Sequence, residues 1–526
     1  MNQNTFFNNY NKKNTNSYKN PNYVFIIASY NNEKNVELNI SSIVLQLYKN
    51  WRIIYINDFS TDKTSEILNK MVLKYNIAEK IHIIENKKNM KQAYSKYIGY
   101  QLVEDNEIVC ILDGDDWLKN DRVLLHLNQY YNQEKYHIVT SNFSLYEDGK
   151  IKKNYNRKYN NDIIKNKHFR YSSYLFCHLK SGLGIYFKSI PEKYFKYKDE
   201  WLDICTDVAE MNCVSELCKE NKIISIDEVL YVYNKDNSLQ YKNSWYNKDP
   251  VTNNKYCKIH SHILSQPQCN FSMPKTFVIH VDEYRDLERN MYGQMNIINK
   301  HNWEMFSAYT PDNIQNIIIQ EKKYFENSEK NIFNDLHIKL FNVQKKHCTE
   351  KALSLIVSNL KLFEKIEKEY PDLDHVAIFE DDIYTHKKYN ELLFINQHNI
   401  QNKDIIYLGC HNENENIYCH SYFDKKFINI KNDNFLYYGT YSLIMSKKAR
   451  QHILKLGVEY FIKNNLSYDI FLNFIRLIEN SENLSFYKYQ YQLFIPNVVK
   501  EGIQIKRNAS FYIKRNMNVN NYHIFK

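Results

Sequence analysis

Between Tyr23 and Leu118 the chain alternates between short apolar runs and amphipathic stretches, and this alternation limits the folds that are open to it. The apolar runs read VFIIAS, WRIIYIN, IHIIEN and IVCIL. The first stretch between them carries Val36, Ile40 and Ile43 at the spacing of one helix face. Strands and helices that alternate with short connections form a mainly parallel sheet with helices on both faces. The sequence therefore predicts an α/β fold.

The fourth apolar run ends abruptly in the acidic segment LDGDD. In extended backbone Asp113 and Asp115 lie on one side, and Gly114 between them allows a ligand to approach the main chain. Two hard oxygen donors suit Mg²⁺ or Mn²⁺ carrying a diphosphate. A solvated acidic turn is the simpler interpretation of this segment alone. Polar clusters at 29–33 and 57–62 follow the first two strands, however, and ligands of such sheets collect at the carboxyl ends of the strands.

Composition excludes several classes of protein. The chain has 526 residues with 43% hydrophobic content, which predicts two to four domains with proper cores. The net charge of +10 is spread along the chain, without the concentrated basic patch of a nucleic-acid-binding protein. No apolar run reaches 18 residues, so no membrane span is expected. We expect no nucleic-acid partner, and the sequence does not indicate an oligomeric state.

The N-terminal tract MNQNTFFNNYNKKNTNSYKN has no apolar segment of signal-peptide length, and the ten cysteines show no regular pairing. These features predict a cytoplasmic protein with a disordered tail over residues 1–20. The abundance of Asn, Lys and Ile, with 46 Tyr, is typical of an AT-rich genome. A large DNA virus or an AT-rich microbe is the source that this composition suggests, with host cytoplasm as the location in the viral case.

Three motifs in order, SYNNE, INDFSTDKT and ILDGDDWL, resemble the nucleotide-binding half of family 2 glycosyltransferases, which have the GT-A fold. The resemblance covers about residues 23–146. It implies that Asp58 accepts a hydrogen bond from a uracil ring, and that Tyr30 and Glu33, with Ser29 beside them, flank the nucleoside. It also implies that a divalent cation, Mn²⁺ or Mg²⁺, and a UDP-sugar donor bind here, with Asp113 and Asp115 serving ribose and metal.

One departure from the family pattern lies in INDFSTD, where Asn57 and Phe59 replace an acidic residue and a glycine. Local structural roles are the alternative for two of the site residues. Asp58 could cap a helix that begins near Thr61, and Glu33 could be a surface charge.

The stretch from Asp199 to Asn234 resembles the back end of these domains, where an Asp just inside a helix removes the proton of the acceptor hydroxyl. Asp207 matches that position. Direct displacement at the anomeric carbon needs such a carboxylate and inverts the configuration. Asp203, four residues earlier on the expected helix, is the second candidate. Both could instead be carboxylates favoured by the helix dipole.

The pattern dissolves over residues 246–273, which we interpret as a linker or as the last wrapping segment of the first domain. Cys257, His260, His262 and Cys269 lie here, but their spacing matches no common zinc site. The pairs Cys410 with His411 and Cys419 with His420 receive the same interpretation, as scattered core or surface residues.

A second series of strands and helices, from KTFVIHV through HVAIFEDDIY to LSYDIFL, resembles family 25 glycosyltransferases over about residues 275–496. The resemblance implies that Glu380 and Asp382 serve nucleotide and metal, and that Asp469 is a possible base. The family's opening Asn-Leu pair and arginines are replaced, and its glycine-containing stretch reads KALSLIVSN. The residues at these departures are His280, Val281, Tyr284, Leu287, Lys351, Ala352, Ser354, Leu355, Ser358 and Asn359.

Together these features predict two tandem GT-A (Rossmann-like) domains with mixed, mainly parallel sheets, at 21–245 and 274–526. The expected activity is metal-dependent, inverting transfer of a sugar from a nucleotide-sugar to a hydroxyl of a glycan or protein acceptor, with the N-terminal domain active. One alternative is that the C-terminal domain is the active galactosyltransferase of the collagen or lipopolysaccharide type. Another is that both domains are non-catalytic modules that bind glycans or a partner.

Overall fold

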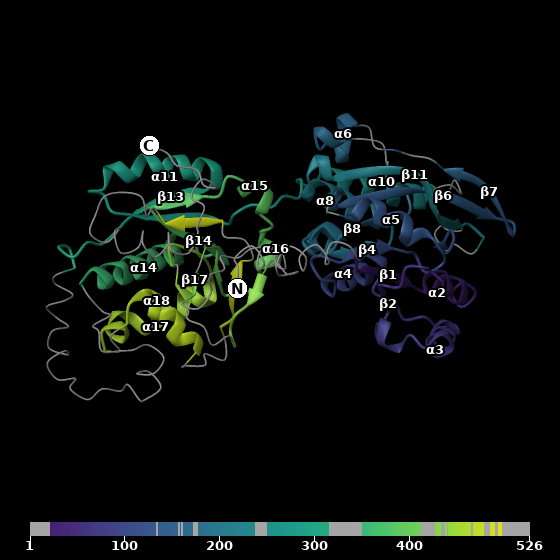
Figure 1. The fold of residues 1–526 in the computed structure, drawn as a ribbon, viewed down its shortest axis with the longest axis horizontal. Coiled ribbons are helices and arrows are strands. Elements are labelled where there is room, and N and C mark those ends of the chain that lie inside the picture. The colour runs from purple at the N-terminus through teal and green to yellow at the C-terminus, as the bar shows by residue number, and fades with distance from the viewer. Residues whose placement is uncertain are drawn as a thin grey trace, which may run out of the picture. The chain divides into compact units, whose positions relative to one another are not determined.

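A computed structural model shows two compact units, Met1–Asn270 and Phe271–Lys526, which are described one at a time (Figure 1). The residues that the structure describes are 21–132, 135–155, 158, 161–171, 177–236, 250–314, 350–409, 411–412, 427–432, 437–438, 440–463, 466–477, 484–489 and 493–496. The tail predicted over 1–20 lies outside them. Part of the stretch expected as a linker is helix α10 (Pro250–Ser265), which packs against α8 (Thr206–Leu217) in the first unit.

The first unit is built on a mixed sheet with the strand order β3-β2-β1-β4-β8-β6-β11-β5, and β7 pairs with β6. The first four strands of this order run parallel, β8 is antiparallel to both of its neighbours, and β6 and β11 are parallel. The bounds are β1 (Tyr23–Ser29), β2 (Trp51–Asn57), β3 (Ile81–Glu85), β4 (Ile108–Ile111), β5 (Trp117–Leu118), β6 (Ile138–Glu147), β7 (Lys150–Tyr155), β8 (Lys180–Leu183) and β11 (Ile223–Asn234). A separate two-stranded pair joins β9 (Lys196–Tyr197) and β10 (Glu200–Trp201).

Helices cover both faces of this sheet, because the central strands are apolar at consecutive positions and present buried side chains on each side. One face packs Phe25 and Tyr55 into a core with Ile40 and Leu68. On the other face Gly99 lies against Ile26, close enough that a Cβ atom would come within 3.1 Å of that side chain. The helices are α2 (Val36–Val44), α3 (Thr64–Tyr75), α4 (Gln92–Gln101), α5 (Val123–Tyr131), α6 (Asn161–Lys165), α7 (Gly184–Lys188), and α8 and α10 as given above.

The second unit has its own mixed sheet, with the order β13-β12-β14-β20-β16-β21-β18. Its strands are β12 (Thr276–His280), β13 (Trp303–Ser307), β14 (His375–Glu380), β16 (Ile405–Tyr407), β18 (Phe427–Asn429), β20 (Ser442–Ser446) and β21 (Phe486–Tyr489). Short pairs join β15 (Ile383–Thr385) to β22 (Phe494–Pro496) and β17 (His411–Asn412) to β19 (Tyr437–Tyr438). The helices are α11 (Arg285–Ile298), α14 (Glu350–Glu369), α15 (Tyr389–Leu392), α16 (Gln397–Ile400), α17 (Lys447–Lys463) and α18 (Tyr468–Leu477).

The two sheets repeat one topology. In the first unit, β2-β1-β4 are parallel, β8 is antiparallel to its two neighbours, and β6 and β11 are parallel. In the second unit β13-β12-β14 are parallel, β20 is antiparallel to its two neighbours, and β16 and β21 are parallel. The prediction of two tandem α/β units with mixed sheets is therefore confirmed.

None of the helices in the described part of the chain combines the length and the apolar character that crossing a membrane requires.

Candidate active site

The acidic loop after β4 lies at the carboxyl end of the parallel strands, as the sequence predicts. Asp113 Oδ1 accepts a hydrogen bond from Gln92 Nε2 at 3.2 Å and lies 3.6 Å from Lys96 Nζ. Burial pushes the pKa of Asp113 upward, but the ammonium of Lys96 and the charges of neighbouring groups hold it below the usual value. Asp113 is thus held as a carboxylate, the form that a cation or a sugar hydroxyl requires.

Gly114 is a glycine because other parts of the chain pack against it. A Cβ atom at this position would lie 2.7 Å from Ser29 Oγ and 2.8 Å from Asn32 Nδ2. Asn32 Nδ2 also donates to Ser29 Oγ at 3.0 Å, so the end of β1 and the acidic loop touch directly. The sequence suggested that the glycine allows a ligand to approach the main chain. The structure shows that it allows these two loops to pack closely.

Asp116 is the buried anchor of the acidic loop. It accepts hydrogen bonds from Tyr231 Oη at 2.6 Å and from the backbone N–H of Asn234 at 2.7 Å, both at the end of β11. Asn234 Nδ2 donates to the backbone oxygen of half-buried Asp115 at 3.1 Å. Burial and the charges of Asp115 and Asp113 raise the pKa of Asp116 well above its usual value. Asp116 therefore fixes the loop that carries the other two carboxylates.

Asp58 is 4% exposed and organises the loop between β3 and α4. Its Oδ1 accepts from Asn86 Nδ2 and from the backbone N–H of Met90, both at 2.7 Å, and its Oδ2 accepts from the backbone N–H of Lys91 at 2.9 Å. The alternative that Asp58 caps the next helix is wrong. That helix begins at Thr64, whose backbone N–H donates to Asp62 instead.

Glu33 and Tyr30 are both half-buried beside the β1 loop. Glu33 Oε2 accepts from the backbone N–H of Lys63 at 3.0 Å, and the backbone N–H of Glu33 donates to Asp62 Oδ2 at 3.0 Å. Glu33 is therefore more than a surface charge, because it ties the β1 loop to the start of α3.

The departure at Asn57 has a local reason. Asn57 Nδ2 donates to Glu85 Oε2 at 2.7 Å and to Ser65 Oγ at 2.6 Å. An aspartate at this position would face the Glu85 carboxylate without a donor, so the amide replaces the acid that the family pattern favours.

Asp207 is the second residue of α8, as the sequence predicts, and it lies beside a group of buried charges. Lys180 Nζ on β8 is 3.7 Å from Asp207 Oδ2. Lys96 Nζ is 3.3 Å from Glu210 Oε1, one turn further along α8. Burial lowers the pKa of Lys96, but the carboxylates of Glu210, Asp113 and Asp207 outweigh it and hold the pKa above its usual value.

Asp203 lies outside the helix, because α8 begins at Thr206 and Cys205 before it has the left-handed φ of 57°. Its Oδ2 instead accepts from Lys255 on α10. The sequence reasoning missed Lys96, Lys180 and Glu210. These residues differ from other charged residues only in being buried, and their burial is not known before the packing of the helices and strands is known.

In the second unit Glu380, Asp381 and Asp382 follow or end β14 in the same way. Burial and the charges of Asp382, Asp469 and Asp381 raise the pKa of Glu380 well above its usual value, and burial with Asp381 raises that of Asp382 to about 7. Asp469, the second residue of α18, accepts from the backbone N–H of Thr440 at 3.2 Å. The three predicted residues Glu380, Asp382 and Asp469 therefore share one electrostatic environment.

Strand register shows which residues of the two units are equivalent. Asp58 donates its backbone N–H to the oxygen of Ser29 at 2.8 Å, and Ala308 donates to the oxygen of His280 at 2.7 Å. Ala308 thus stands where the first unit has Asp58. The β4 and β14 registers place Gly114 level with Ser29, and Asp381 level with His280.

Strand register also identifies the counterparts of Asp207 and Lys180 in the second unit. Ile111 pairs with Lys180 across β4 and β8, and the equivalent Ile378 pairs with Leu443 across β14 and β20. Leu443 therefore occupies the position of Lys180. Asp207 and Asp469 are each the second residue of the helix that precedes the last parallel strand.

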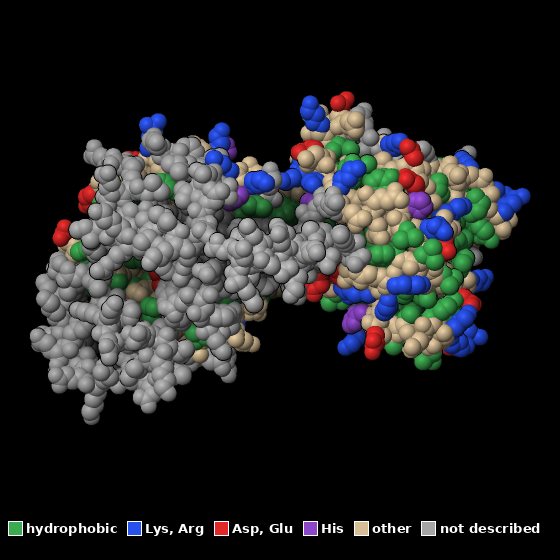
Figure 2. All heavy atoms as spheres, in the orientation of Figure 1, with side chains coloured by type: hydrophobic (Ala, Val, Ile, Leu, Met, Phe, Trp, Pro, Cys, Tyr) green, Lys and Arg blue, Asp and Glu red, His purple; other side chains and the backbone are tan. Residues whose placement is uncertain are grey.

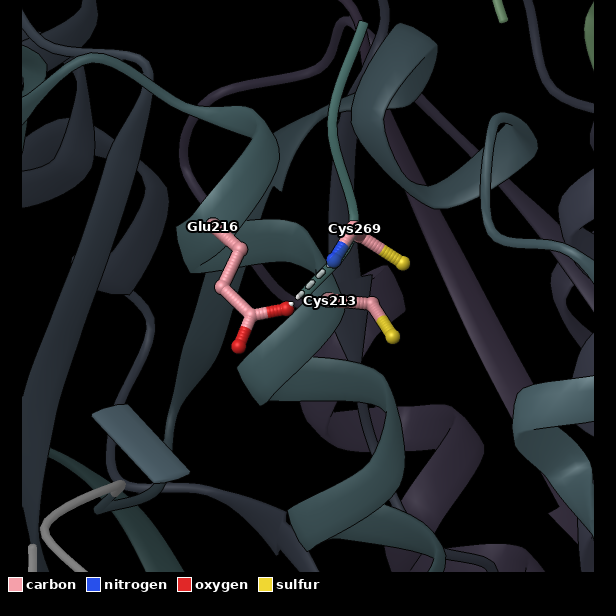
Figure 3. A group of neighbouring side chains, drawn as sticks. All are labelled: Cys213, Glu216 and Cys269. Carbon is pink, nitrogen blue, oxygen red and sulfur yellow. Dashed lines mark hydrogen bonds between the residues drawn. The ribbon is translucent and has the colours of Figure 1, made fainter. Parts of the chain in front are cut away.

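Among the described residues, one group could offer three ligand atoms to a metal, namely Cys213, Glu216 and Cys269 (Figure 3). Figure 3 shows the two sulfur atoms beside each other and a Glu216 carboxylate oxygen bonded to the backbone nitrogen of Cys269. That carboxylate pairs with the guanidinium of Arg170 at 2.6 and 2.8 Å and accepts the backbone N–H of Cys269 at 2.8 Å. A cation already fills this site, so it is a buried ion pair that locks α8 in place.

Among the described residues, Cys269 lies beside Cys213 and Glu216 of α8. It does not form a group of possible metal ligands with Cys257, His260 and His262, the zinc set considered from the sequence. Cys410, Cys419 and His420 lie outside the described residues, as does the side chain of His411.

Comparison with known families bears on this geometry. The model of the family described as "Glycosyl transferase family 2" matches residues 24–195. Residues 24–195 form a family 2 glycosyltransferase domain. This span contains the loops after β1, β2 and β4 that carry the site, whereas α8 and the second unit lie beyond it.

Two curated relatives of the family 2 domain illustrate the likeness. An "Uncharacterized glycosyltransferase" of Haemophilus influenzae is 31% identical over 103 residues, which is 20% of this chain and 40% of that protein. "Glycosyltransferase GlyG" of Streptococcus pneumoniae is 28% identical over 123 residues, which is 23% of this chain and 39% of that protein. The chain thus spans less than half of the length of these relatives.

Solved structures give distant likenesses. S. aureus TarS 1-349 in complex with UDP-GlcNAc has a TM-score of 0.32 and 14% identity, covering 66% of this chain and 82% of that one. The mannosyltransferase PcManGT from Pyrobaculum calidifontis, in complex with GDP-Man and Mn²⁺, has a TM-score of 0.34 and 12% identity, covering 47% and 66%.

Proposed function

We propose that this protein transfers a sugar from a nucleotide-sugar, a UDP-sugar in the first instance, to a hydroxyl of a glycan or protein acceptor, with inversion and in the N-terminal unit. The observation that carries the proposal is the meeting of three elements at one edge of the sheet. These are the acidic loop with Asp113 and the start of α8 with Asp207, which Gln92 and Lys96 on α4 join, and Asp58, which binds the backbone just before α4. Gln92 donates to Asp113 and accepts from Thr206 at 2.8 Å.

The nucleoside role of Asp58 is compatible with its internal bonds. A carboxylate offers about four lone-pair positions, and the chain fills three of them. Oδ2, which takes one bond, retains a position for the N–H of a pyrimidine ring. The loop 86–91 is thereby fixed before a nucleotide arrives, which lowers the entropy cost of binding.

Asp113 and Asp115 fit a divalent cation, because carboxylate oxygens are the donors that Mg²⁺ and Mn²⁺ prefer. When bound, the cation supplies positive charge to the departing diphosphate. Within the chain itself, Lys96 already places an ammonium 3.6 Å from Asp113 and partly balances its charge. Asp207 is then the carboxylate that receives the proton of the attacking hydroxyl, and one-step attack inverts the anomeric carbon.

The comparison of the two units supports activity in the first. The second unit keeps the acidic residues Glu380, Asp382 and Asp469. It has Ala308 in place of Asp58, the residue proposed to bind the uracil ring. Its Asp381, at the position of Gly114, is bonded to His280 at 2.8 Å. The proposal includes a second unit that is similar to family 25 and is either altered in specificity or serves to position an acceptor.

A nucleic-acid-binding function receives no support from the surface. Figure 2 shows Lys and Arg side chains of the first unit spread among acidic, apolar and other side chains, without one basic patch on the described part of that face. A cytoplasmic location belongs to the proposal.

The test is release of UDP from UDP-glucose, UDP-galactose, UDP-GlcNAc and UDP-GalNAc with Mn²⁺ by the whole chain. We expect Asp115→Ala to abolish release and Asp382→Ala to preserve it. Exposed acidic residues provide matched controls, Asp121→Ala in the first unit and Asp372→Ala in the second. Loss in Asp382→Ala alone would move the activity to the second unit. No release by the wild type with any of the four donors would favour the binding-module alternative.

A further inference from the structure

Lys180 is a buried charge with an unusual environment. The residue is 0% exposed, and its Nζ makes no hydrogen bond among the described residues. In the part of the chain that the structure describes, its one ion pair is with Asp207 Oδ2, at 3.7 Å. An ammonium removed from water without hydrogen bonds is costly, so a residue of this kind needs a compensating role.

The fold itself does not require a cation here. The second unit repeats the strand order and register, and Leu443 occupies the equivalent place on β20, opposite Ile378. There the equivalent carboxylate, Asp469, accepts from the backbone N–H of Thr440 instead of facing a lysine. A leucine is therefore sufficient to pack this position, and the lysine in the first unit serves something other than the core.

The charges around Asp207 show what Lys180 adds. Asp207 is close to two other carboxylates, Asp113 and Glu210, and the nearby Lys96 pairs with both of those, at 3.6 and 3.3 Å. Among the described residues, Lys180 is the lysine that forms an ion pair with Asp207, whereas Lys96 acts on Asp207 only at longer range. The side chain of Asp207 is 34% exposed, whereas that of Lys180 is 1% exposed, so the lysine lies behind the carboxylate on the side away from solvent.

We infer that Lys180 is a positioning residue for the base: its ammonium holds the Asp207 carboxylate in a fixed orientation from behind, with Oδ1 anchored by the backbone N–H of Val208 at 2.9 Å. The inference rests on the proposed function, since it deepens the role given there to Asp207. Lys180 acts through Asp207 and does not itself touch the donor, because its Nζ is enclosed by the protein.

A double-mutant cycle tests this directly. If two residues act as one unit, removing the second one causes no further loss of activity once the first has been removed. The four proteins are the wild type, Lys180→Met, Asp207→Asn and the double variant, each as the whole chain. UDP release from the donor that the wild type turns over is measured with Mn²⁺, and UDP affinity is measured by calorimetry. We expect Lys180→Met to lower kcat by about 10- to 100-fold, a part of the usual effect of a base, with UDP affinity unchanged within about twofold.

The decisive result is the double variant, which we expect to be no slower than Asp207→Asn. The inference would be overturned if the factors by which the two single variants lower kcat multiplied in the double variant. It would also be overturned if Lys180→Met lowered UDP affinity as much as it lowered kcat. Lys180→Leu follows the second unit and provides a variant that packs if the methionine does not. Lys150→Met, on exposed β7, is the matched control. If the wild type released no UDP, the proposed function itself would be refuted. If the wild type were active and the effects of the two substitutions were independent, only the inference about Lys180 would be refuted.

Discussion

His280 Nδ1 lies 2.8 Å from Asp381 Oδ2, at the level of the sheet where the first unit brings Ser29 against Gly114. Asp381 also accepts the backbone N–H of Val281 at 3.2 Å. The second unit has therefore replaced a close contact between two small residues by a bonded polar pair. The backbone topology is the same, but the space beside the acidic loop is occupied differently.

Replacing His280 by alanine should destabilise the second unit. Asp381 is buried, and the substitution removes one of the two hydrogen-bond partners given above, so we expect a loss of about 1–3 kcal/mol in the free energy of unfolding. Urea denaturation measures this loss. UDP release by the first unit should stay unchanged, and a parallel loss of release would contradict the separation of roles between the units.

Gly114→Ala should impair nucleotide handling. Its Cβ would lie 2.7 Å from Ser29 Oγ, a distance that forces the β1 loop and the acidic loop apart. We expect UDP release to fall by at least about tenfold, because displacements near 1 Å already misplace reacting groups. Ser29→Gly together with Asn32→Ala in the same chain removes the colliding atoms. Failure of these two changes to restore the melting temperature lost in Gly114→Ala would show that the close contact is not the reason for the glycine.

Phe59→Gly should stabilise the first unit. Phe59 is 48% exposed and has φ of 65°, a left-handed conformation that costs a residue with a side chain about 1–2 kcal/mol. Glycine removes this strain but adds about 0.5–1 kcal/mol of unfolded-state entropy, so we expect a net gain of about 0.5–1 kcal/mol. Thermal unfolding measures it, with Phe59→Ala as the control that keeps the strain. A lower melting temperature for the glycine variant would refute the argument.

Stability of the first unit should depend on the protonation of His178. Burial, together with the charge of Lys180, lowers the pKa of His178 from 6.5 to about 3. Between these values the unfolded chain binds a proton that the folded chain does not, so stability is complete above pH 6.5 and falls as the pH drops toward 3. The slope from this residue is at most about 1.4 kcal/mol for each pH unit. Denaturation of the wild type and of His178→Phe at several pH values isolates it, and equal slopes would contradict the prediction.

The Arg170–Glu216 pair should be structural and independent of metal. Arg170→Met leaves the buried Glu216 carboxylate without its guanidinium, so we expect a loss of about 3–5 kcal/mol. A zinc chelator should leave the melting temperature of the wild type unchanged. A fall in that temperature on chelation, together with zinc found by elemental analysis, would show that Cys213, Glu216 and Cys269 hold a metal after all.

The sequence by itself determined the order of strands and helices and the edge at which the acidic residues meet. Apolar runs such as YVFIIAS are continuous because central parallel strands are buried on both faces, and each run ends where polar residues begin. The place of Asp113 at the end of β4 follows from this pattern, and the place of Asp207 near the start of a helix follows from the family resemblance. Asp203 was not placed correctly, because the left-handed turn at Cys205 starts the helix later than the spacing predicts.

Tertiary structure alone decided which charges lie inside and what they do there. Lys96, Lys180 and Glu210 come from three different elements, and neither their burial nor their pairing follows from local sequence, because both depend on contacts between residues far apart in the chain. The same holds for Gly114, whose neighbour Ser29 is 85 positions away, and for Ala308, which strand register reveals as the counterpart of Asp58. Local patterns fix the elements, whereas the packing between elements fixes the electrostatics of the site.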